Sequence, residues 1–226
     1  MLALCLTAWR DADDDILPLS MAWHRAQGVD HILIARDQPI SEQGQAMTEL
    51  QDMALWLGCE WVLNSDADEF WVPSQGTLAE LFVSLPPGLG MATAAVVEFT
   101  IDGAHSYSRH MNWMGQRLAP KTCHRPAQGV RVLNGNAGVS GAHGGSRLLH
   151  NLQVLHWPLR SAAQAQRKCQ SLAATFPVGR LRRNSWLAAY QGMALDPVNV
   201  LARLPGREMV PDARLQRVLE TSRVAA

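Results

Sequence analysis

The chain has 226 residues and carries 20 basic and 20 acidic side chains, so its formal net charge at pH 7 is zero. This balance argues against a nucleic-acid or anionic-membrane partner held by bulk electrostatics. The four cysteines are scattered without CxxC spacing, which argues against a disulfide framework or a zinc site and favours a reducing, cytoplasmic compartment. The apolar run at 2–9 is too short for a transmembrane segment, so we expect none.

The first half of the chain alternates predicted strands and helices. Residues 2–8 are apolar throughout, as in a parallel strand buried on both faces. The acidic cluster at 11–15 predicts a helix start, and Gly28 predicts its end. Alternation of this kind predicts a parallel sheet with right-handed connections. We expect strands at 2–8, 29–35, 61–64 and 91–100, and helices at about 14–27, 47–57 and 77–84.

Residues 61–73, WVLNSDADEFWVP, place three carboxylates directly after a predicted strand. Open α/β sheets bind their ligands at the carboxyl ends of strands. Asp66 and Asp68 are two residues apart, so in an extended loop they can grip one object between them. Carboxylate oxygens suit Mg²⁺ or Mn²⁺, which usually share substrate phosphates. The motif predicts a metal–diphosphate clamp; the alternative is an ordinary solvated acidic turn or a helix cap.

The second half of the chain is less regular. Residues 103–128 contain few periodic apolar positions and predict a loop, and the Gly-rich segment 134–146 has neither a GxGxxG register nor a P-loop lysine. Short strands are predicted at 130–133 and 152–156. Helices are predicted at 161–174, about 183–193 and 211–223. We therefore divide the chain into a core, 1–160, and a helical C-terminal extension packed on it, 161–226.

A series of motifs spans roughly residues 4–170: Arg10-Asp11, Ile16-Leu17, His24, the segment 28–31, the segment 61–71, and the segment 154–161 followed by Lys168. In this order they resemble family-2-like glycosyltransferases of the GT-A fold, in particular a small branch with a DADEF core. The resemblance implies an α/β fold with a Rossmann-like, mostly parallel sheet flanked by helices and a helical C-terminal appendage.

The same resemblance implies an enzyme that moves a sugar from a nucleotide-diphosphate sugar to a hydroxyl acceptor on a glycan or another small molecule. The transfer would be assisted by Mn²⁺ or Mg²⁺ and would invert the anomeric centre. By this analogy Asp68 ligates the metal, Asp66 contacts the ribose or the metal and its water shell, and His156 is a further ligand. Donor-binding residues would be Arg10, Asp11, Asp37, Asp66, Arg160 and Lys168. Structural roles are the ordinary alternative for His156, Arg160 and Lys168.

An inverting transfer needs a carboxylate that takes the proton of the attacking hydroxyl. Glu98 and Asp102 lie at the carboxyl end of the fourth predicted strand and are the candidates for this base, with His143 a weaker third. A solvated strand end is the ordinary alternative for both carboxylates.

Two departures from the family pattern leave other functions open. The loop 35–45 keeps only Asp37 of an acidic stretch, and Gly135-Asn136-Ala137 stands where the family often has Gly-Asn-His. One alternative is a degenerate, non-catalytic member that binds a nucleotide sugar or a protein partner. Another is a metal-dependent phosphohydrolase, for which the sequence offers no complete set of nucleophile, lysine and distant acidic ligands.

Overall fold

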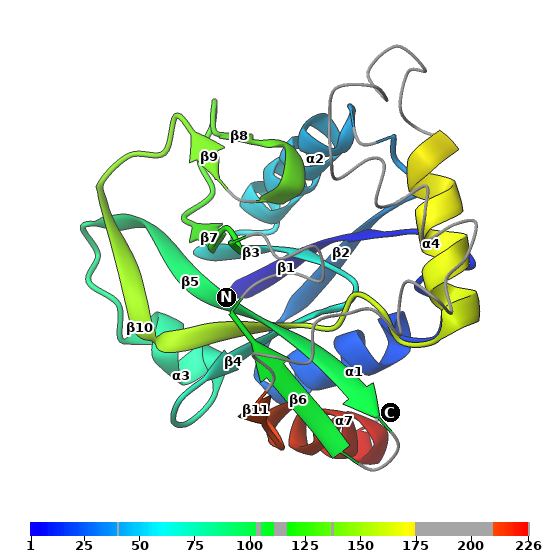
Figure 1. Cartoon of the computed structure of the whole chain (residues 1–226). Helices are drawn as coiled ribbons and strands as arrows, with labels where there is room; N and C mark the ends of the chain where they lie inside the picture. Colours follow the sequence, from blue (N-terminus) through cyan, green and yellow to red (C-terminus); the bar gives the residue numbers. More distant parts are fainter. Residues whose placement is uncertain (40, 103–104, 111–116, 137, 175–209, 226) are drawn as a thin grey trace.

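A computed structural model describes residues 1–226 except 40, 103–104, 111–116, 137, 175–209 and 226. Helices cover a central sheet, and both cores lie against it (Figure 1). The strands are β1 Leu2–Ala8, β2 His31–Arg36, β3 Trp61–Asp66, β4 Glu69–Pro73, β5 Leu89–Asp102, β6 His105–Arg109, β7 Lys121–His124, β8 Arg131–Val132, β9 Val139–Ser140, β10 Gly145–His156 and β11 Val210–Pro211. The helices are α1 Leu17–Ala26, α2 Gln43–Trp56, α3 Leu78–Val83, the 3-10 helix η1 Asn134–Asn136, α4 Ala162–Ala174 and α7 Arg214–Ala225.

The main sheet is mostly parallel. β1 lies between β2 and β3 and is parallel to both. β7 joins β3 to β5 in antiparallel pairing, β6 and β11 continue beyond β5, and β10 pairs with β5 and β4. As a result β1, β2, β3, β5, β10 and β11 run in one direction, and β4, β6 and β7 run in the other. The predicted fold class, a mostly parallel sheet flanked by helices, is confirmed.

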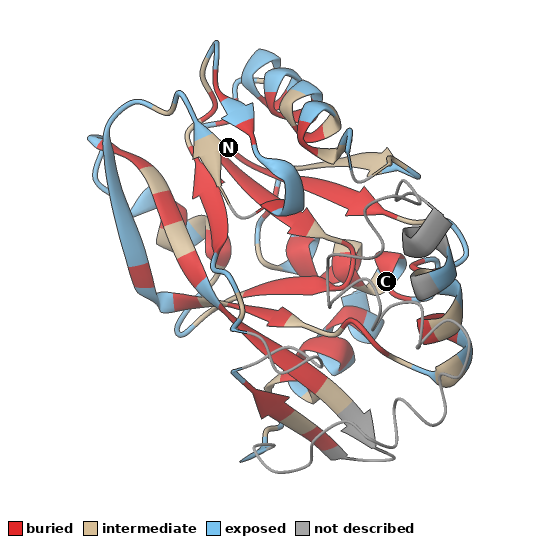
Figure 2. Ribbon diagram, turned by 45° about the horizontal axis from the view of Figure 1, so that its top comes forward, coloured by how far each residue is buried: buried red, intermediate tan, exposed pale blue. Residues whose placement is uncertain are grey.

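Two hydrophobic cores cover the two faces of the sheet. On one face the larger core joins α1, α3 and α7 to the strands through Trp23, Phe82 and Leu215. On the other, Met47 and Leu50 of α2 pack over Cys5 of β1. Every residue of β1 is buried (Figure 2), as expected for the middle of a parallel sheet covered on both sides.

The local signals in the first half of the chain are largely confirmed. β1 has the predicted bounds, and Gly28 follows α1 with a φ of 82°, a left-handed conformation that favours glycine. Thr77 and Glu80 form the expected capping box at α3. The start of the first helix was predicted wrongly. Asp13 and Asp14 accept hydrogen bonds from Trp9 N and Asp11 N in the preceding turns, so α1 begins only at Leu17.

The later chain differs more from the sequence prediction. The predicted loop 103–128 contains β6 and β7, and β4 and β11 were not predicted. All four strands are short. β4, β7 and β11 are formed by pairing with distant segments, whereas β6 folds back on the neighbouring β5 as a hairpin. The predicted helix at about 183–193 lies outside the described residues, and the division at residue 160 stays a prediction. Within the described ranges, no helix combines the length and the apolar character needed to cross a membrane.

Candidate functional site

A cavity of about 450 Å³ opens at the carboxyl ends of β1 and β3. These strands are paired so that Thr7 lies beside Asp66, and β2 flanks β1 on its other side. From β1 the chain adds β2 on one side and β3 on the other, so the order in which strands join the sheet reverses at this point. Open α/β folds bind their ligands at such a reversal. The lining includes the predicted site residues Asp66, Asp68, Glu98, His156 and Lys168 together with Thr7, Asp13, Gln38, Gln43, Asn134 and Gly135.

Asp66 ends β3, and donors surround its carboxylate. Oδ1 accepts hydrogen bonds from Thr7 Oγ1, from Gln43 Nε2 at 3.2 Å and from Asn136 Nδ2 at 3.0 Å. Oδ2 accepts one from Lys121 Nζ at 2.8 Å. Burial alone would raise the pKa of Asp66, but the nearby Lys121 charge and these hydrogen bonds lower it below its ordinary value. Asp66 therefore holds β1, α2, η1 and β7 together by one charge.

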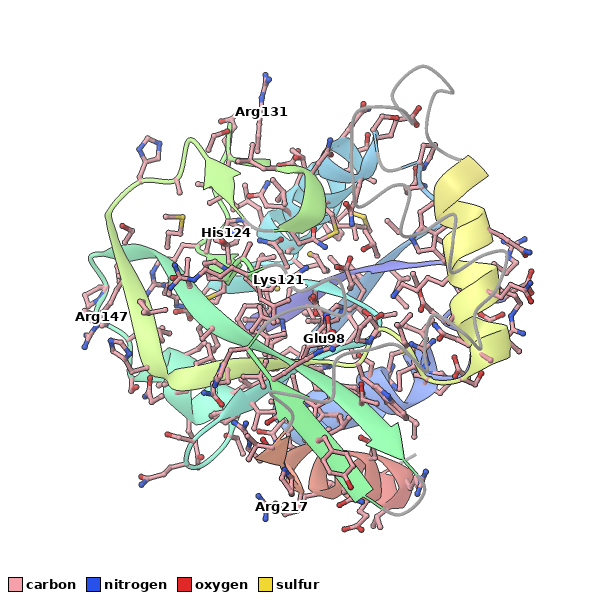
Figure 3. All side chains as sticks on the ribbon, viewed as in Figure 1. Glu98, Lys121, His124, Arg131, Arg147 and Arg217 are labelled. Atoms are coloured by element: carbon pink, nitrogen blue, oxygen red, sulfur yellow. The ribbon has the colours of Figure 1, made fainter. Side chains whose placement is uncertain are left out.

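Lys121 of β7 is the cation of the polar cluster around Asp66, which we call the Asp66 hub. Figure 3 places Lys121 in the interior of the molecule. Besides Asp66, its ammonium lies 2.9 Å from Glu69 Oε1 and 3.2 Å from Gly135 O. All three of its hydrogens thus have acceptors. Burial opposes the charge of Lys121, but Asp66 and Glu69 outweigh burial and raise its pKa. Burial raises the pKa of Glu69 to about 7, with Lys121 opposing.

Asp68 lies in the turn between β3 and β4 and is 1% exposed. Its Oδ2 accepts a hydrogen bond from Lys168 Nζ, and Arg160 Nη1 is 3.9 Å from the same oxygen. Burial would raise the pKa of Asp68, but Lys168, His156 and Arg160 lower it strongly. Its Oδ1 is buried and has no hydrogen-bond partner in the described part of the chain.

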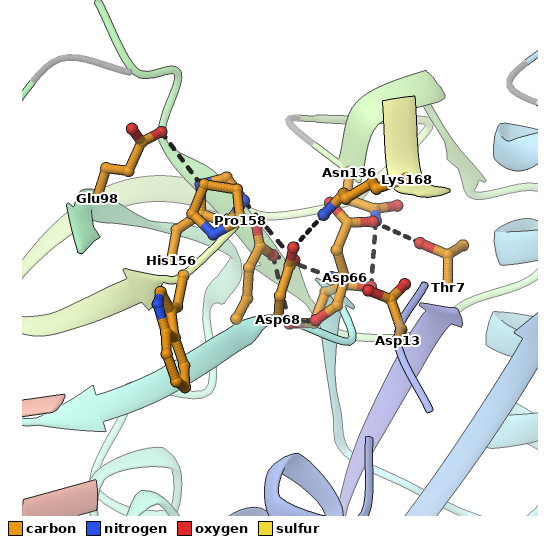
Figure 4. A network of polar contacts seen from close by, with 12 residues as sticks. Thr7, Asp13, Asp66, Asp68, Glu98, Asn136, His156, Pro158 and Lys168 are labelled. Carbon is orange, nitrogen blue, oxygen red and sulfur yellow. Dashed lines mark hydrogen bonds and ion pairs between the residues drawn. The ribbon is translucent and has the colours of Figure 1, made fainter. Parts of the chain in front are cut away.

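His156 ends β10 between two carboxylates (Figure 4). Nε2 lies 3.6 Å from Asp68 Oδ1, and Nδ1 lies 3.7 Å from Glu98 Oε2. The pairing of β10 with β5 sets His156 beside Glu98. Burial lowers the pKa of His156 to about 4, so its imidazole is neutral at pH 7 and keeps a lone pair for a ligand.

Glu98, a predicted base, lies at the cavity but already has a cationic partner. Its Oε1 accepts hydrogen bonds from Arg109, with Nε at 3.0 Å, and both side chains are buried. Asp102, the other candidate, is the last residue of β5, and its side chain lies outside the described residues. His143 is exposed before β10 and is not among the described residues that line the cavity.

The predicted donor-binding residues outside the lining form two groups. Arg10 and Asp37 make an exposed ion pair at 3.3 Å, next to Asp11, whose carbonyl accepts from Arg167 Nε. Arg160 is buried and bound to Asp15 at 2.8 and 2.9 Å and to Asp13 at 3.3 Å. Its guanidinium thus fixes the turn at 12–15 close to Asp68. Phosphate contacts of these residues stay predictions.

Sequence reasoning missed Lys121, Asn136, Thr7, Gln43 and Asp13. Lys121 was assigned to a loop because β7 is only four residues long. In the sequence Asn136 stands out only as part of Gly135-Asn136-Ala137, where the family often has Gly-Asn-His. It has a φ of 57°, a conformation that asparagine tolerates better than most residues. The acidic cluster at 11–15 was recognised, but as a helix start. Thr7, Gln43, Lys121 and Asn136 are far apart in the sequence and meet only because each binds the carboxylate of Asp66.

A divalent ion shared with a substrate stays a prediction for this cavity, and two of the side chains that line it have suitable donor atoms. Within the described ranges no group of three or more His, Cys, Asp or Glu side chains is placed to hold a metal. Asp68 nevertheless offers a buried oxygen without a hydrogen bond, and the neutral His156 lies beside it. Mg²⁺ typically uses one or two carboxylates and completes its shell with water and substrate phosphates. By contrast, the oxygens of Asp66 are already occupied by donors.

The chain matches no known family in a scan against family models, and no curated protein matches it. Two solved structures are similar in part. One is a glycosyltransferase involved in glycosylation of the major capsid of PBCV-1, with 13% identity, 98% of this chain and 90% of that chain covered, and a TM-score of 0.29. The other is a mannose-1-phosphate geranyltransferase from Thermus thermophilus, with 13% identity, 91% and 68% covered, and a TM-score of 0.29. At this level of similarity, nothing about activity follows from either structure.

Proposed function

We propose that the chain is a glycosyltransferase that moves a sugar from a nucleotide-diphosphate sugar to a hydroxyl acceptor with inversion, assisted by Mg²⁺ or Mn²⁺. The observation that carries the proposal is the position of Asp68. Its Oδ1, which has no hydrogen bond from any described residue, lies with His156 in a cavity of about 450 Å³ at the carboxyl end of the sheet. That size suits a small-molecule ligand, and that edge of the sheet is where α/β folds bind nucleotides.

In this mechanism Asp68 and His156 would hold the cation, and Lys168 would contact the diphosphate. When bound, the cation neutralises charge that builds up on the departing nucleoside diphosphate. Asp66 and Lys121 keep β1, β3 and β7 in register, so that Asp68 is presented from a rigid turn. A rigid support matters because charge stabilisation depends on ligands held in place before the reaction.

In the proposed reaction Glu98 takes the acceptor proton, and its position at the cavity beside His156 supports this role. Its ion pair with Arg109 favours the ionised form and so weakens it as a base. The same pair favours a second candidate function: a non-catalytic protein that binds a nucleotide sugar. The two candidates share the donor site and differ in turnover.

The deciding experiment is calorimetric titration of uridine diphosphate and guanosine diphosphate, with and without Mn²⁺. The proteins are the wild type, Asp68→Asn and the matched control Glu49→Gln. Glu49 lies on the exposed side of α2, away from the cavity, and accepts a hydrogen bond from Gln45 on the same helix. We expect Mn²⁺ to strengthen binding to the wild type and to the control, and Asp68→Asn to lose this gain.

Turnover is then measured as the release of nucleoside diphosphate from a panel of nucleotide sugars with hydroxyl acceptors. Mn²⁺-dependent release that Asp68→Asn loses supports a transferase. Mn²⁺-dependent binding without release supports the non-catalytic alternative. If a folded wild type binds neither diphosphate under any condition, both candidates are wrong.

A further inference from the structure

The site contains two lysines whose surroundings differ, Lys121, which is buried, and Lys168, which is partly exposed. Lys121 has three acceptors, from Asp66, Glu69 and Gly135, and is fixed. Lys168 reaches into the cavity from α4 and has a single hydrogen-bond acceptor among the described residues, Asp68 Oδ2. Its side chain is 15% exposed, and Asp68 is 1% exposed. Lys168 therefore neutralises the predicted metal ligand with an ammonium that no second described residue anchors by a hydrogen bond (Figure 4).

The ion pair creates a conflict with a metal ion. While Lys168 is paired with Asp68, the charge of this carboxylate is already balanced, and the ammonium of Lys168 repels a divalent cation. The guanidinium of Arg160, 3.9 Å from Asp68, adds to the repulsion and cannot leave, because Asp15 and the carbonyl of Ala12 hold it. At separations of a few ångströms in a site shielded from water, such repulsion weakens cation binding considerably.

A diphosphate removes the conflict. It brings negative charge into the cavity and offers acceptor oxygens to an ammonium on a flexible four-carbon stem. Burial opposes the charge of Lys168, but Asp68 and Asp13 favour it, and Asp13 also lines the cavity. Lys168 can thus change partners by side-chain rotation, without moving α4.

We propose that Lys168 is an exchangeable counter-ion: it occupies Asp68 in the free protein and moves to the diphosphate when cation and nucleotide enter. The inference rests on the proposed function and adds a binding order. Cation and nucleotide bind cooperatively, because each removes the obstacle to the other, and the coupling is reciprocal.

The test measures Mn²⁺ affinity by electron paramagnetic resonance and calorimetry, with and without uridine or guanosine diphosphate. The variants are Lys168→Met, which keeps length and removes charge, and the matched control Arg167→Met. Arg167 is the neighbouring cation on α4, is exposed, and bonds the carbonyl of Asp11 rather than Asp68. Thermal melts with and without Mn²⁺ establish that each variant folds.

In the wild type we expect the diphosphate to strengthen Mn²⁺ binding at least about tenfold. Lys168→Met should bind Mn²⁺ alone about tenfold more tightly than the wild type, bind the diphosphate more weakly, and show little remaining coupling. Its melting temperature should rise with Mn²⁺ by more than that of the wild type. Arg167→Met should match the wild type within about twofold, since its charge does not face Asp68.

Two failures are distinguishable. If the diphosphates bind but Lys168→Met binds Mn²⁺ alone no more tightly than the wild type, the exchange is wrong and the proposed function survives. If neither the wild type nor Lys168→Met binds a diphosphate with or without Mn²⁺, the proposed function is wrong. The exchange of Lys168 is then wrong as well.

Discussion

The ammonium nitrogen of Lys121 lies 2.8 Å from Oδ2 of Asp66, and the two residues come from adjacent antiparallel strands, β7 and β3. β7 stands between β3 and β5, so the strand that supplies this lysine also joins the two halves of the main sheet. The charge of Asp66 is thereby balanced inside the fold, whereas Asp68, whose Oδ2 is paired with Lys168, keeps an Oδ1 without a hydrogen bond in the described part of the chain.

Lys121→Met should destabilise the protein by about 3 kcal/mol at pH 8, because it leaves the buried Glu69 and the partly exposed Asp66 beside each other without their cation. The loss should shrink as pH falls, since Glu69, whose pKa is already raised to about 7, can bind a proton and remove one charge. Urea denaturation at pH 8 and pH 6 measures both effects.

Lys121→Arg, which keeps the charge, is the companion variant and should lose less than Lys121→Met at pH 8. If the two variants lost the same free energy of unfolding, side-chain shape rather than charge would determine how much Lys121 stabilises the Asp66 hub. A deficit in Lys121→Met that does not depend on pH would rule out the role assigned to Glu69.

Glu98→Gln separates two roles for one carboxylate. Glu98 lies between Arg109 and His156, so we expect it to orient the imidazole as well as to serve as base. Loss of a carboxylate behind a metal-binding histidine typically lowers metal affinity by 10- to 100-fold. We therefore expect Mn²⁺-dependent nucleotide binding to weaken about tenfold, measured by calorimetry. Unchanged binding with abolished turnover would assign Glu98 to proton transfer alone.

The parts of the fold that were predictable from the sequence are those fixed by short-range signals. The continuous apolar run at 2–8, Gly28 and the Thr77–Glu80 box each specify their local conformation through adjacent residues. The acidic motif at 66–68 was also recognisable, because its carboxylates directly follow a buried strand and directly precede an aromatic pair. These signals predict that the motif lies at the carboxyl end of the sheet, where the cavity is found.

The rest of the site depends on pairing between distant segments. β7 is four residues long, and it becomes a strand because β3 and β5 provide partners on both sides. Lys121 thus meets Asp66 across 55 positions, and Lys168 meets Asp68 across 100. No periodicity within either segment records such contacts. The ion pair of Glu98 with Arg109 spans only 11 positions, but it depends on the hairpin of β5 and β6, and the sequence pattern did not reveal β6.

Asn136 tests how η1 is fixed to the site. Its side chain donates to Ser65 O and Asp66 Oδ1, and its backbone has a φ of 57°. Asn136→Ala loses both hydrogen bonds and places a less tolerant residue in a left-handed conformation, whereas Asn136→Gly loses only the hydrogen bonds. We expect Asn136→Ala to be the less stable variant by about 1 kcal/mol in urea denaturation. The reverse order would show that backbone strain at this position is unimportant.

His24 should make folding sensitive to acid. Its buried ring has Nδ1 2.7 Å from Ser20 O and Nε2 3.2 Å from Trp71 N, so Nδ1 donates and Nε2 accepts. Burial lowers its pKa to about 4, against about 6.5 in an unfolded chain. The unfolded state therefore binds more protons between these values, and stability is complete above pH 6.5 and falls as pH drops towards 4. The loss from this residue is on the order of 3 kcal/mol.

His24→Gln keeps an acceptor for Trp71 N but cannot titrate, so it should be less stable than the wild type at pH 7.5 and lose less on acidification. Urea denaturation at pH 7.5 and pH 4.5 gives the comparison. His124 and His156, whose pKa values burial also lowers to about 4, titrate in both proteins and cancel in the difference. His150→Gln, at an exposed position, should follow the wild type. Parallel losses in the wild type and His24→Gln would mean that the acid sensitivity arises from the other buried histidines or from the carboxylates.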